Sequence, residues 1–189
     1  MKKNRLFLIV FFVLALGVLL AIYFSNSSPK TPPSAPLITL ETNFGVIKFE
    51  TYPEDAPKTV ENFVKLAGKG FYNGLTFHRV VPGFVIQGGD PNGNGTGGPG
   101  YQFEDELNPD TASYKDGYQK GVVAMANSGP NTNGSQFFIM LEDYPLPNLY
   151  TIFGKVMEGQ EVVDMIGRVS TDENDRPLEA VIINRVTVN

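Results

Sequence analysis

The sequence predicts a mostly β domain, an antiparallel barrel or sandwich, preceded by an N-terminal transmembrane helix. Its 189 residues are enough for one domain with an appendage. Many short runs of apolar and β-branched residues are separated by turns rich in glycine and proline, which is typical of strands. Only two segments have the periodicity of amphipathic helices, and helices do not alternate with strands as they do in a parallel sheet.

The first 24 residues predict a basic start followed by a membrane anchor. Residues 6–24 form an uncharged apolar run of 19 residues. That length is close to the roughly 20 residues of a spanning helix and exceeds the roughly 7–15 of a cleavable signal. Lys2, Lys3 and Arg5 precede the run and favour a cytoplasmic N-terminus. We therefore expect a single-pass cell-membrane protein with an extracytoplasmic C-terminal domain; secretion after cleavage near residues 33–36 is the alternative.

Residues 25–36 and 37–189 predict a linker and a folded domain. The linker is polar with four prolines, a composition that keeps a chain extended. In the domain, Asn43–Gly45 predicts a hairpin turn, and Pro57–Lys69 and Gln160–Gly167 predict helices with one apolar face. The other expected strands span residues 75–81, 83–88, 121–126, 136–141, 151–156 and 180–188.

The composition excludes several kinds of site. The chain has no cysteine and one histidine, which excludes disulfides, a thiolate nucleophile and a multi-histidine metal site. From Leu37 onward, 11 basic and 20 acidic residues give the domain a net charge of −9, which argues against nucleic-acid binding. We expect no metal, no cofactor and no nucleic-acid partner.

The segment FHRVVPGFVIQGGD, Phe77–Asp90, places a charge in an apolar stretch. Strand alternation predicts that Arg79 lies on the same face as Phe77 and Val81. A charged side chain on a buried face costs free energy unless it is paired. Arg79 is therefore either in an internal salt bridge or part of a functional site. His78 has no serine-centred motif to serve as a base, and we interpret it as a core histidine with satisfied ring nitrogens.

A second unusual segment is GVVAMANSGPNTNGSQFFIM, Gly121–Met140. Its loop supplies neutral amide side chains beside an apolar stretch that contains Phe137 and Phe138. Amide donors and acceptors next to an apolar surface suit an extended peptide. Neither segment contains an activated nucleophile, so any reaction must proceed without covalent catalysis.

Three further segments are interpreted as structural. The glycine-rich loop Asp90–Gly100 lacks the Gly-Lys-Ser/Thr ending of a phosphate-binding loop. The carboxylates of Phe103–Leu107 alternate between the faces of a strand and indicate a solvated edge, although paired carboxylates also serve glycoside hydrolysis. Thr171–Arg176 lacks the spacing of a calcium loop and predicts a polar turn.

Together and in this order, the two unusual segments resemble the cyclophilin family of peptidyl-prolyl cis–trans isomerases. The resemblance extends over about residues 37–189. It implies an eight-stranded antiparallel closed barrel capped by two α-helices, and an enzyme that acts on proline-containing polypeptides without a cofactor. Such an enzyme would accelerate X-Pro isomerisation during the folding of exported or cell-surface proteins, and we expect it to be a monomer.

The resemblance also implies roles for individual residues. Arg79 would polarise the prolyl nitrogen, Gln87 would orient Arg79, and Phe84 would form a wall of the proline pocket. Thr96 and Gly97 would contact the residues before the proline in a secondary groove. The other substrate-binding residues that the family pattern implies are Val85, Ala126, Asn127, Ser128, Gln136, Phe138, Leu146 and Tyr150.

One segment departs from the family pattern. In DYPLPNLYTIFG, Tyr150 stands where well-studied members have a histidine, and the chain has no tryptophan. Cyclosporin binding depends on that tryptophan in the family, so the resemblance implies weak binding of the drug and retained activity. A non-catalytic module that binds proline peptides is the alternative, and a groove plugged by Tyr150 or Pro145 would favour it. A glycan hydrolase is a third class, supported only by scattered carboxylates.

Overall fold

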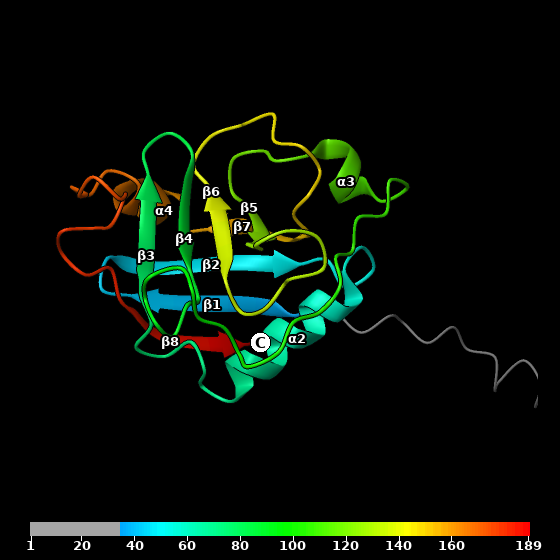
Figure 1. Cartoon of the computed structure of the whole chain (residues 1–189), viewed down its shortest axis with the longest axis horizontal. Helices are drawn as coiled ribbons and strands as arrows, with labels where there is room; N and C mark the ends of the chain where they lie inside the picture. Colours follow the sequence, from blue (N-terminus) through cyan, green and yellow to red (C-terminus); the bar gives the residue numbers. More distant parts are fainter. Residues whose placement is uncertain (1–34) are drawn as a thin grey trace, which may run out of the picture. The chain divides into compact units, whose positions relative to one another are not determined.

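The computed structural model describes residues 35–189. The expected membrane segment, residues 1–24, lies outside the described residues, as does the linker up to residue 34. Within residues 35–189, no helix combines the length and the apolar character that crossing a membrane requires. The elements of this part are, in order (Figure 1), β1 Leu37–Thr42, β2 Gly45–Thr51, α2 Pro57–Gly68, β3 Phe77–Val81, β4 Val85–Gly88, α3 Ala112–Asp116, β5 Val122–Met125, β6 Phe137–Met140, β7 Ile152–Glu158, α4 Gln160–Ile166 and β8 Ile183–Val188.

The strands form one antiparallel sheet in the order β3-β4-β6-β5-β7-β2-β1-β8. The sheet curls until residues just before its two edge strands pair with each other. Thr76 bridges to Ile182, and the Phe77 N–H donates to the Val181 carbonyl at 2.9 Å. The result is an eight-stranded half-barrel. The prediction of a mostly β, eight-stranded antiparallel fold with helices is therefore confirmed. The predicted closed barrel is not, because the two edges meet only through bonds between residues 74–80 and 175–183 and not as a full strand pair.

Most predicted elements are confirmed with small shifts at their ends. In the hairpin between β1 and β2, the Thr42 hydroxyl oxygen accepts the N–H groups of Phe44 and Gly45, both at 3.1 Å. The two predicted helices are α2 and α4. The sequence does not predict α3, because this five-residue helix buries no side chain and so lacks the apolar periodicity on which the prediction depends.

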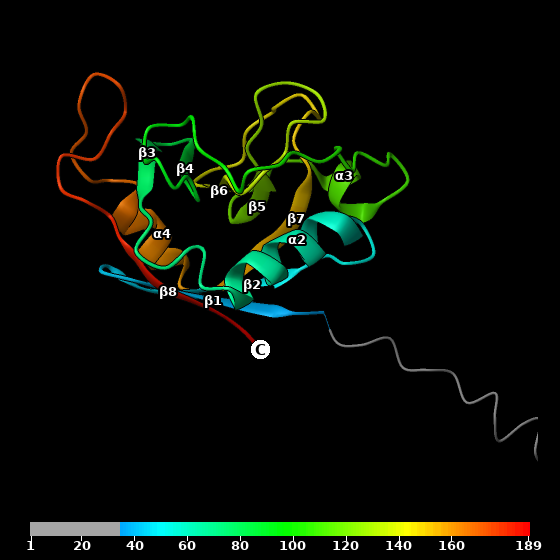
Figure 2. The same cartoon turned by 60° about the horizontal axis from the view of Figure 1, so that its bottom comes forward.

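The barrel interior is packed around Phe63 of α2. Its ring centroid lies 4.7 Å from that of Tyr72, 5.4 Å from that of Phe137 and 5.3 Å from that of Phe153. Ile166 of α4 is buried in the same core. Figures 1 and 2 show α2 and α4 at different ends of the barrel. Side chains of both helices thus pack into the barrel core, and the outer face of β3, β4, β6 and β5 remains for a site.

Candidate active site

Strands β5 and β6 are buried on both faces. This explains why their sequences are apolar without interruption. In β6, Phe137 and Ile139 belong to the barrel core, whereas Phe138 and Met140 belong to a second apolar cluster. In β5 the side chains alternate in the same way, with Val123 in the barrel core. The second cluster therefore lies on the outer face of the sheet, where it forms an apolar floor.

One row of cross-strand pairs extends from the predicted catalytic residue across this floor. Arg79 of β3 pairs with Gln87 of β4, which pairs with Phe138 of β6. Phe138 pairs with Ala124 of β5, and Ala124 pairs with Ile152 of β7. Directly paired residues point to the same face, with Cβ atoms about 4.5–5.5 Å apart. The row thus sets a guanidinium beside an amide and then beside the apolar floor.

The expectation that Arg79 shares a face with Phe77 is wrong. The pairing of β3 with β4 shifts register between these two residues, so that His78 lies in a bulge. Val80 points into the barrel core with Phe77, whereas Val81 belongs to the outer cluster and Arg79 pairs with an outward-facing glutamine. The bulge is the local feature that directs the arginine outward.

The Arg79 side chain is held from two sides. Its Nη1 donates to Oε1 of Gln87 at 3.4 Å, and its Nε lies 3.4 Å from Oδ2 of Asp175. The side chains of Arg79 and Asp175 are 39% and 42% exposed, so water reaches this ion pair. The internal salt bridge that the sequence offers as one alternative is therefore not found, because the observed ion pair is exposed to solvent. The functional role of Arg79 stays a prediction.

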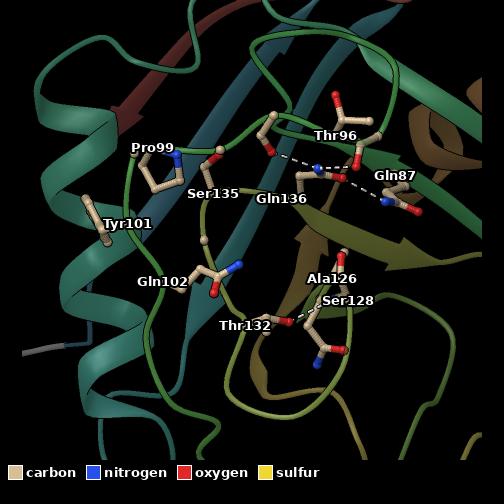
Figure 3. A pocket seen from close by; sticks show the side chains of 16 residues that line it. Gln87, Thr96, Pro99, Tyr101, Gln102, Ala126, Ser128, Thr132, Ser135 and Gln136 are labelled. Carbon is tan, nitrogen blue, oxygen red and sulfur yellow. Dashed lines mark hydrogen bonds between the residues drawn. The ribbon is translucent and has the colours of Figure 1, made fainter.

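A polar groove of about 790 Å³ opens beside the row (Figure 3). Its walls are the glycine-rich loop and the segment that connects β5 to β6. The predicted site residues that line it are Gln87, Thr96, Gly97, Ala126, Asn127, Ser128 and Gln136. The lining residues that the sequence does not predict include Pro99, Tyr101, Gln102 and Thr132. None of the lining side chains carries a charge, which suits a neutral stretch of polypeptide.

A chain of hydrogen bonds connects this groove to the arginine. Nε2 of Gln136 donates to the carbonyls of Gly95 at 3.0 Å and Gly97 at 2.9 Å. Oε1 of Gln136 accepts from Nε2 of Gln87 at 3.0 Å, as Figure 3 shows. Gln87 in turn accepts from Arg79. The glycine-rich loop and the guanidinium are thereby linked through two side chains.

Asp90 gives the glycine-rich loop its shape. It is 1% exposed, and its carboxylate accepts the N–H groups of Asn92 at 2.8 Å, Asn94 at 2.9 Å and Gly95 at 2.5 Å. Burial raises the pKa of Asp90, but the three backbone donors outweigh burial and hold the pKa below its ordinary value. Gly97 packs against this carboxylate so closely that a Cβ atom would collide with it.

The remaining predicted residues form an apolar wall. Phe84, Val85, Leu146 and Tyr150 all pack in the outer cluster with Phe138. The rings of Phe138 and Tyr150 meet edge to face with centroids 5.6 Å apart. This is the kind of surface against which a proline ring packs, because it is apolar and partly aromatic.

The backbone of the segment before β7 is fixed in place. The Tyr150 N–H donates to the Tyr118 hydroxyl at 3.0 Å, and this hydroxyl donates to the Tyr150 carbonyl at 2.8 Å. Pro145 is exposed, and neither Pro145 nor Tyr150 is among the residues that line the groove. Neither residue therefore plugs the polar groove.

Asn127 uses both ends of its side-chain amide within the protein. Its Nδ2 donates to the Leu149 carbonyl at 2.9 Å, and its Oδ1 accepts the Gly129 N–H at 3.3 Å. The neighbouring Ser128 N–H donates to the Thr132 hydroxyl at 2.8 Å. The part of Asn127 that remains for a peptide is thus its backbone.

Two residues that the sequence analysis does not single out extend the site. Tyr144 tilts against Phe84, with ring centroids 4.8 Å apart, and is 48% exposed. The two tyrosines of DYPLPNLY are the feature of the sequence that could indicate this contact. Asp175 reaches Arg79 from the loop between α4 and β8. No periodicity or motif indicates that second contact, because the two residues are far apart in the chain.

Two carboxylates of the segment FEDEL have structural roles. Glu106 accepts the N–H groups of Lys58 at 3.0 Å and Thr59 at 2.9 Å, in the first turn of α2. Asp105 accepts the Asn131 N–H at 2.8 Å. Both residues are partly exposed, which agrees with the interpretation as a solvated edge, and both also bind backbone groups of other segments.

His78 is 8% exposed, and within the described residues neither ring nitrogen has a hydrogen-bond partner. The expectation of satisfied ring nitrogens is therefore wrong. Burial lowers the pKa of His78, Asp90 opposes this effect, and Arg176 and Arg79 add to it. His78 is thus a buried residue of the bulge whose imidazole binds a proton less readily than a free histidine, although it is next to Arg79 in sequence.

Known proteins match most of this chain in sequence. A family model described as cyclophilin type peptidyl-prolyl cis-trans isomerase/CLD matches residues 37–188. Peptidyl-prolyl cis-trans isomerase CYP18-1 of Arabidopsis thaliana is 49% identical over 156 residues, which cover 80% of this chain and 95% of that protein. Peptidyl-prolyl cis-trans isomerase A of Mycobacterium tuberculosis is 44% identical over 182 residues, which cover 87% and 98%.

A solved structure gives the same result. The crystal structure of a cyclophilin type peptidyl-prolyl cis-trans isomerase of Cryptosporidium parvum, in the presence of the dipeptide Ala-Pro, aligns with a TM-score of 0.72 and 37% identity. The alignment covers 81% of this chain and 98% of that chain. This chain therefore belongs to the cyclophilin-type peptidyl-prolyl cis–trans isomerases.

Proposed function

We propose that this protein accelerates the cis–trans isomerisation of X-Pro bonds, with Arg79 as the catalytic group. Rotation about a peptide bond has a barrier of about 18–20 kcal/mol because resonance gives the bond partial double-bond character. A guanidinium that donates to the prolyl nitrogen favours its pyramidal, single-bonded form. This interaction is stronger in the twisted state than in either planar state, which is the condition for catalysis.

The row Arg79–Gln87–Phe138 is the observation that carries this proposal. It places a cation at the edge of an apolar floor, and Gln87 holds one of its nitrogens. A proline ring seated against Phe138, with Phe84 and Val85 as walls, would direct its nitrogen toward the guanidinium. Each 1.36 kcal/mol of stabilisation of the twisted state would speed the step about tenfold. The step needs no acid, base or cofactor.

In this proposal the polypeptide runs from the polar groove into the apolar pocket. Thr96 and Gly97 contact the residues before the proline. Three residues that line the groove bind the chain on its way to the pocket: Ala126, Ser128 and, through its backbone, Asn127. The pocket is completed by Gln136, Leu146 and Tyr150.

We propose further that the clients are exported or cell-surface polypeptides, and that residues 6–24 anchor the protein in the membrane. The support is the uncharged run of 19 residues after a basic start. Flotation with liposomes should recover the full-length protein but not residues 25–189. A full-length protein that stays out of the vesicle fraction would overturn the anchor, and an N-terminus near residue 34 in the mature protein would support secretion instead.

Weak cyclosporin binding and a monomeric state complete the proposal. The chain lacks tryptophan, and Tyr150 occupies the outer wall beside Phe138. Titration calorimetry with cyclosporin should therefore give a low affinity. Tight binding would contradict the proposal of weak binding. Sedimentation of the full-length protein should give the mass of one chain, and a dimer mass would contradict the monomer.

NMR exchange spectroscopy on a short Ala-Pro peptide separates the isomerase from the binding module. The proposal predicts that catalytic amounts of the full-length protein accelerate exchange between the cis and trans signals. If the protein binds the peptide but leaves the exchange rate unchanged, the groove is a recognition site and the proposed activity is wrong.

A further inference from the structure

The polar turn at residues 172–176 is fixed beside the strand that carries the catalytic arginine. Within the turn, the Asp172 carboxylate accepts the Asn174 N–H at 2.9 Å. The turn is tied to β3 by the backbone, because the Asp175 carbonyl accepts the Val80 N–H at 2.8 Å. The side chain of Asp175 is therefore presented from an anchored backbone and not from a free loop.

Two neighbouring side chains of this turn bind different parts of the site. Asp175 has a φ of 63°, a left-handed conformation that aspartate and asparagine tolerate better than most residues. Its carboxylate lies 3.4 Å from Nε of Arg79. The next residue, Arg176, donates to the Gly93 carbonyl in the glycine-rich loop. The turn thus contacts both the guanidinium and the loop that lines the groove.

We propose that Asp175 is a positioning residue for the isomerisation, and that it holds the Nε edge of Arg79 while an Nη group meets the prolyl nitrogen. This inference rests on the proposed function. It assigns a role to a residue outside the two segments that define the site in the sequence.

The geometry of the guanidinium supports this role. A guanidinium is a planar fork whose N–H groups have fixed directions. With Nε 3.4 Å from the Asp175 carboxylate and Nη1 donating to Gln87 at 3.4 Å, two separate contacts restrict the plane of the fork more than either contact alone. Within residues 35–189, Nη2 has neither a hydrogen bond nor an ion pair and can meet a substrate. With one contact alone, the plane could turn about that contact, and a half-exposed arginine would populate several rotamers.

The consequence should appear in catalysis more than in binding. The arginine interacts more strongly with the twisted state than with either planar state. Misplacing it should therefore slow the catalysed step while the groove and the apolar pocket, which Asp175 does not line, continue to bind the peptide.

The test compares Asp175→Asn with Glu173→Gln in the full-length protein. Asparagine is nearly isosteric with aspartate and tolerates the left-handed backbone, so the first variant removes the charge without straining the turn. Glu173 is exposed and lies in the same turn, so the second variant makes the same change of charge away from Arg79. Both variants are compared with the wild type by circular dichroism to confirm the folded state.

Three quantities are measured for each protein: kcat/KM on an Ala-Pro peptide, the Kd for that peptide, and the NMR signal of the Arg79 Nε–Hε group, assigned by its loss in Arg79→Ala. We expect Asp175→Asn to lower kcat/KM about two- to fivefold, the range for a solvent-accessible ion pair. The Kd should stay unchanged and the Nε–Hε signal should shift. Glu173→Gln should resemble the wild type in all three.

Other outcomes overturn the role. An Asp175→Asn variant as active as Glu173→Gln would show that the carboxylate does not position the arginine. A Kd that weakens as much as kcat/KM falls would indicate a general effect on the site instead. If the wild type itself does not accelerate exchange, the proposed function is wrong and the positioning role falls with it; the Nε–Hε signal then still reports whether the ion pair forms.

Discussion

Nε2 of Gln87 donates to Oε1 of Gln136 at 3.0 Å, and the hydrogen bonds around this contact determine the orientation of both amides. Gln136 uses its Nε2 for the carbonyls of Gly95 and Gly97, so only its oxygen can face Gln87. Gln87 must then present its nitrogen to Gln136, which leaves its oxygen to accept from Arg79. The glycine-rich loop therefore determines, through two amides, which group of Gln87 meets the arginine.

A change of Gln136 to glutamate should disrupt this arrangement. The carboxylate has nearly the same shape but no N–H to donate, so two loop carbonyls lose their donor. We expect a loss of about 1–3 kcal/mol in the free energy of unfolding and weaker binding of an Ala-Pro peptide. Urea denaturation and peptide titration measure the two effects. Gln102→Glu changes another residue of the same groove and should have little effect; equal losses in the two variants would contradict the role of Gln136.

Removal of the central aromatic ring should destabilise the barrel strongly. Phe63 is fully buried and its ring lies close to four other aromatic rings in the core. We expect Phe63→Ala to cost about 3–5 kcal/mol in the free energy of unfolding. Phe71 is only partly buried at the margin of the same core, so Phe71→Ala should cost clearly less. Urea denaturation at neutral pH gives both values, and similar losses would show that Phe63 is not the centre of the core.

Glu106 should stabilise α2 by direct contact, although it lies far from this helix in the sequence. The helix has no side-chain cap of its own, and Glu106 accepts two N–H groups of its first turn. Glu106→Ala should therefore lower the free energy of unfolding by about 1–2 kcal/mol, as the loss of a helix cap does. Glu104→Ala removes only an exposed ion pair with Lys58 and should cost much less. Activity per folded molecule should not change in either variant.

His78 should make the stability of the domain depend on pH. Burial lowers the pKa of His78 below 6.5 in the folded protein, whereas the unfolded chain binds a proton near that ordinary value. Between the folded and the ordinary pKa the unfolded state holds more protons, so the free energy of unfolding falls as the pH drops below about 6.5. Urea denaturation between about pH 5 and pH 8 measures this slope. The variant His78→Phe should reduce the dependence of the free energy of unfolding on pH. An unchanged dependence in this variant would show that another group causes it.

The strands and the long helices of this fold could be predicted from the sequence because their periodicity is local. The apolar run Phe137–Met140 even indicates that both faces of its strand are buried, as the two clusters show. The bulge at His78 could not be predicted, because a register shift depends on the partner strand. The ion pair of Arg79 with Asp175 is a contact between distant segments, and nothing in either segment alone encodes it.

We propose that the Arg79 guanidinium catalyses X-Pro isomerisation. The most direct test measures cis–trans exchange in an Ala-Pro peptide with the full-length wild type, Arg79→Ala and Arg185→Ala. The last variant removes an arginine that is ion-paired with Glu41 on β1, away from the site. We expect Arg185→Ala to match the wild type and Arg79→Ala, still folded by circular dichroism, to lose at least about tenfold in rate. A folded Arg79→Ala variant with wild-type exchange rates would show that this guanidinium is not the catalytic group.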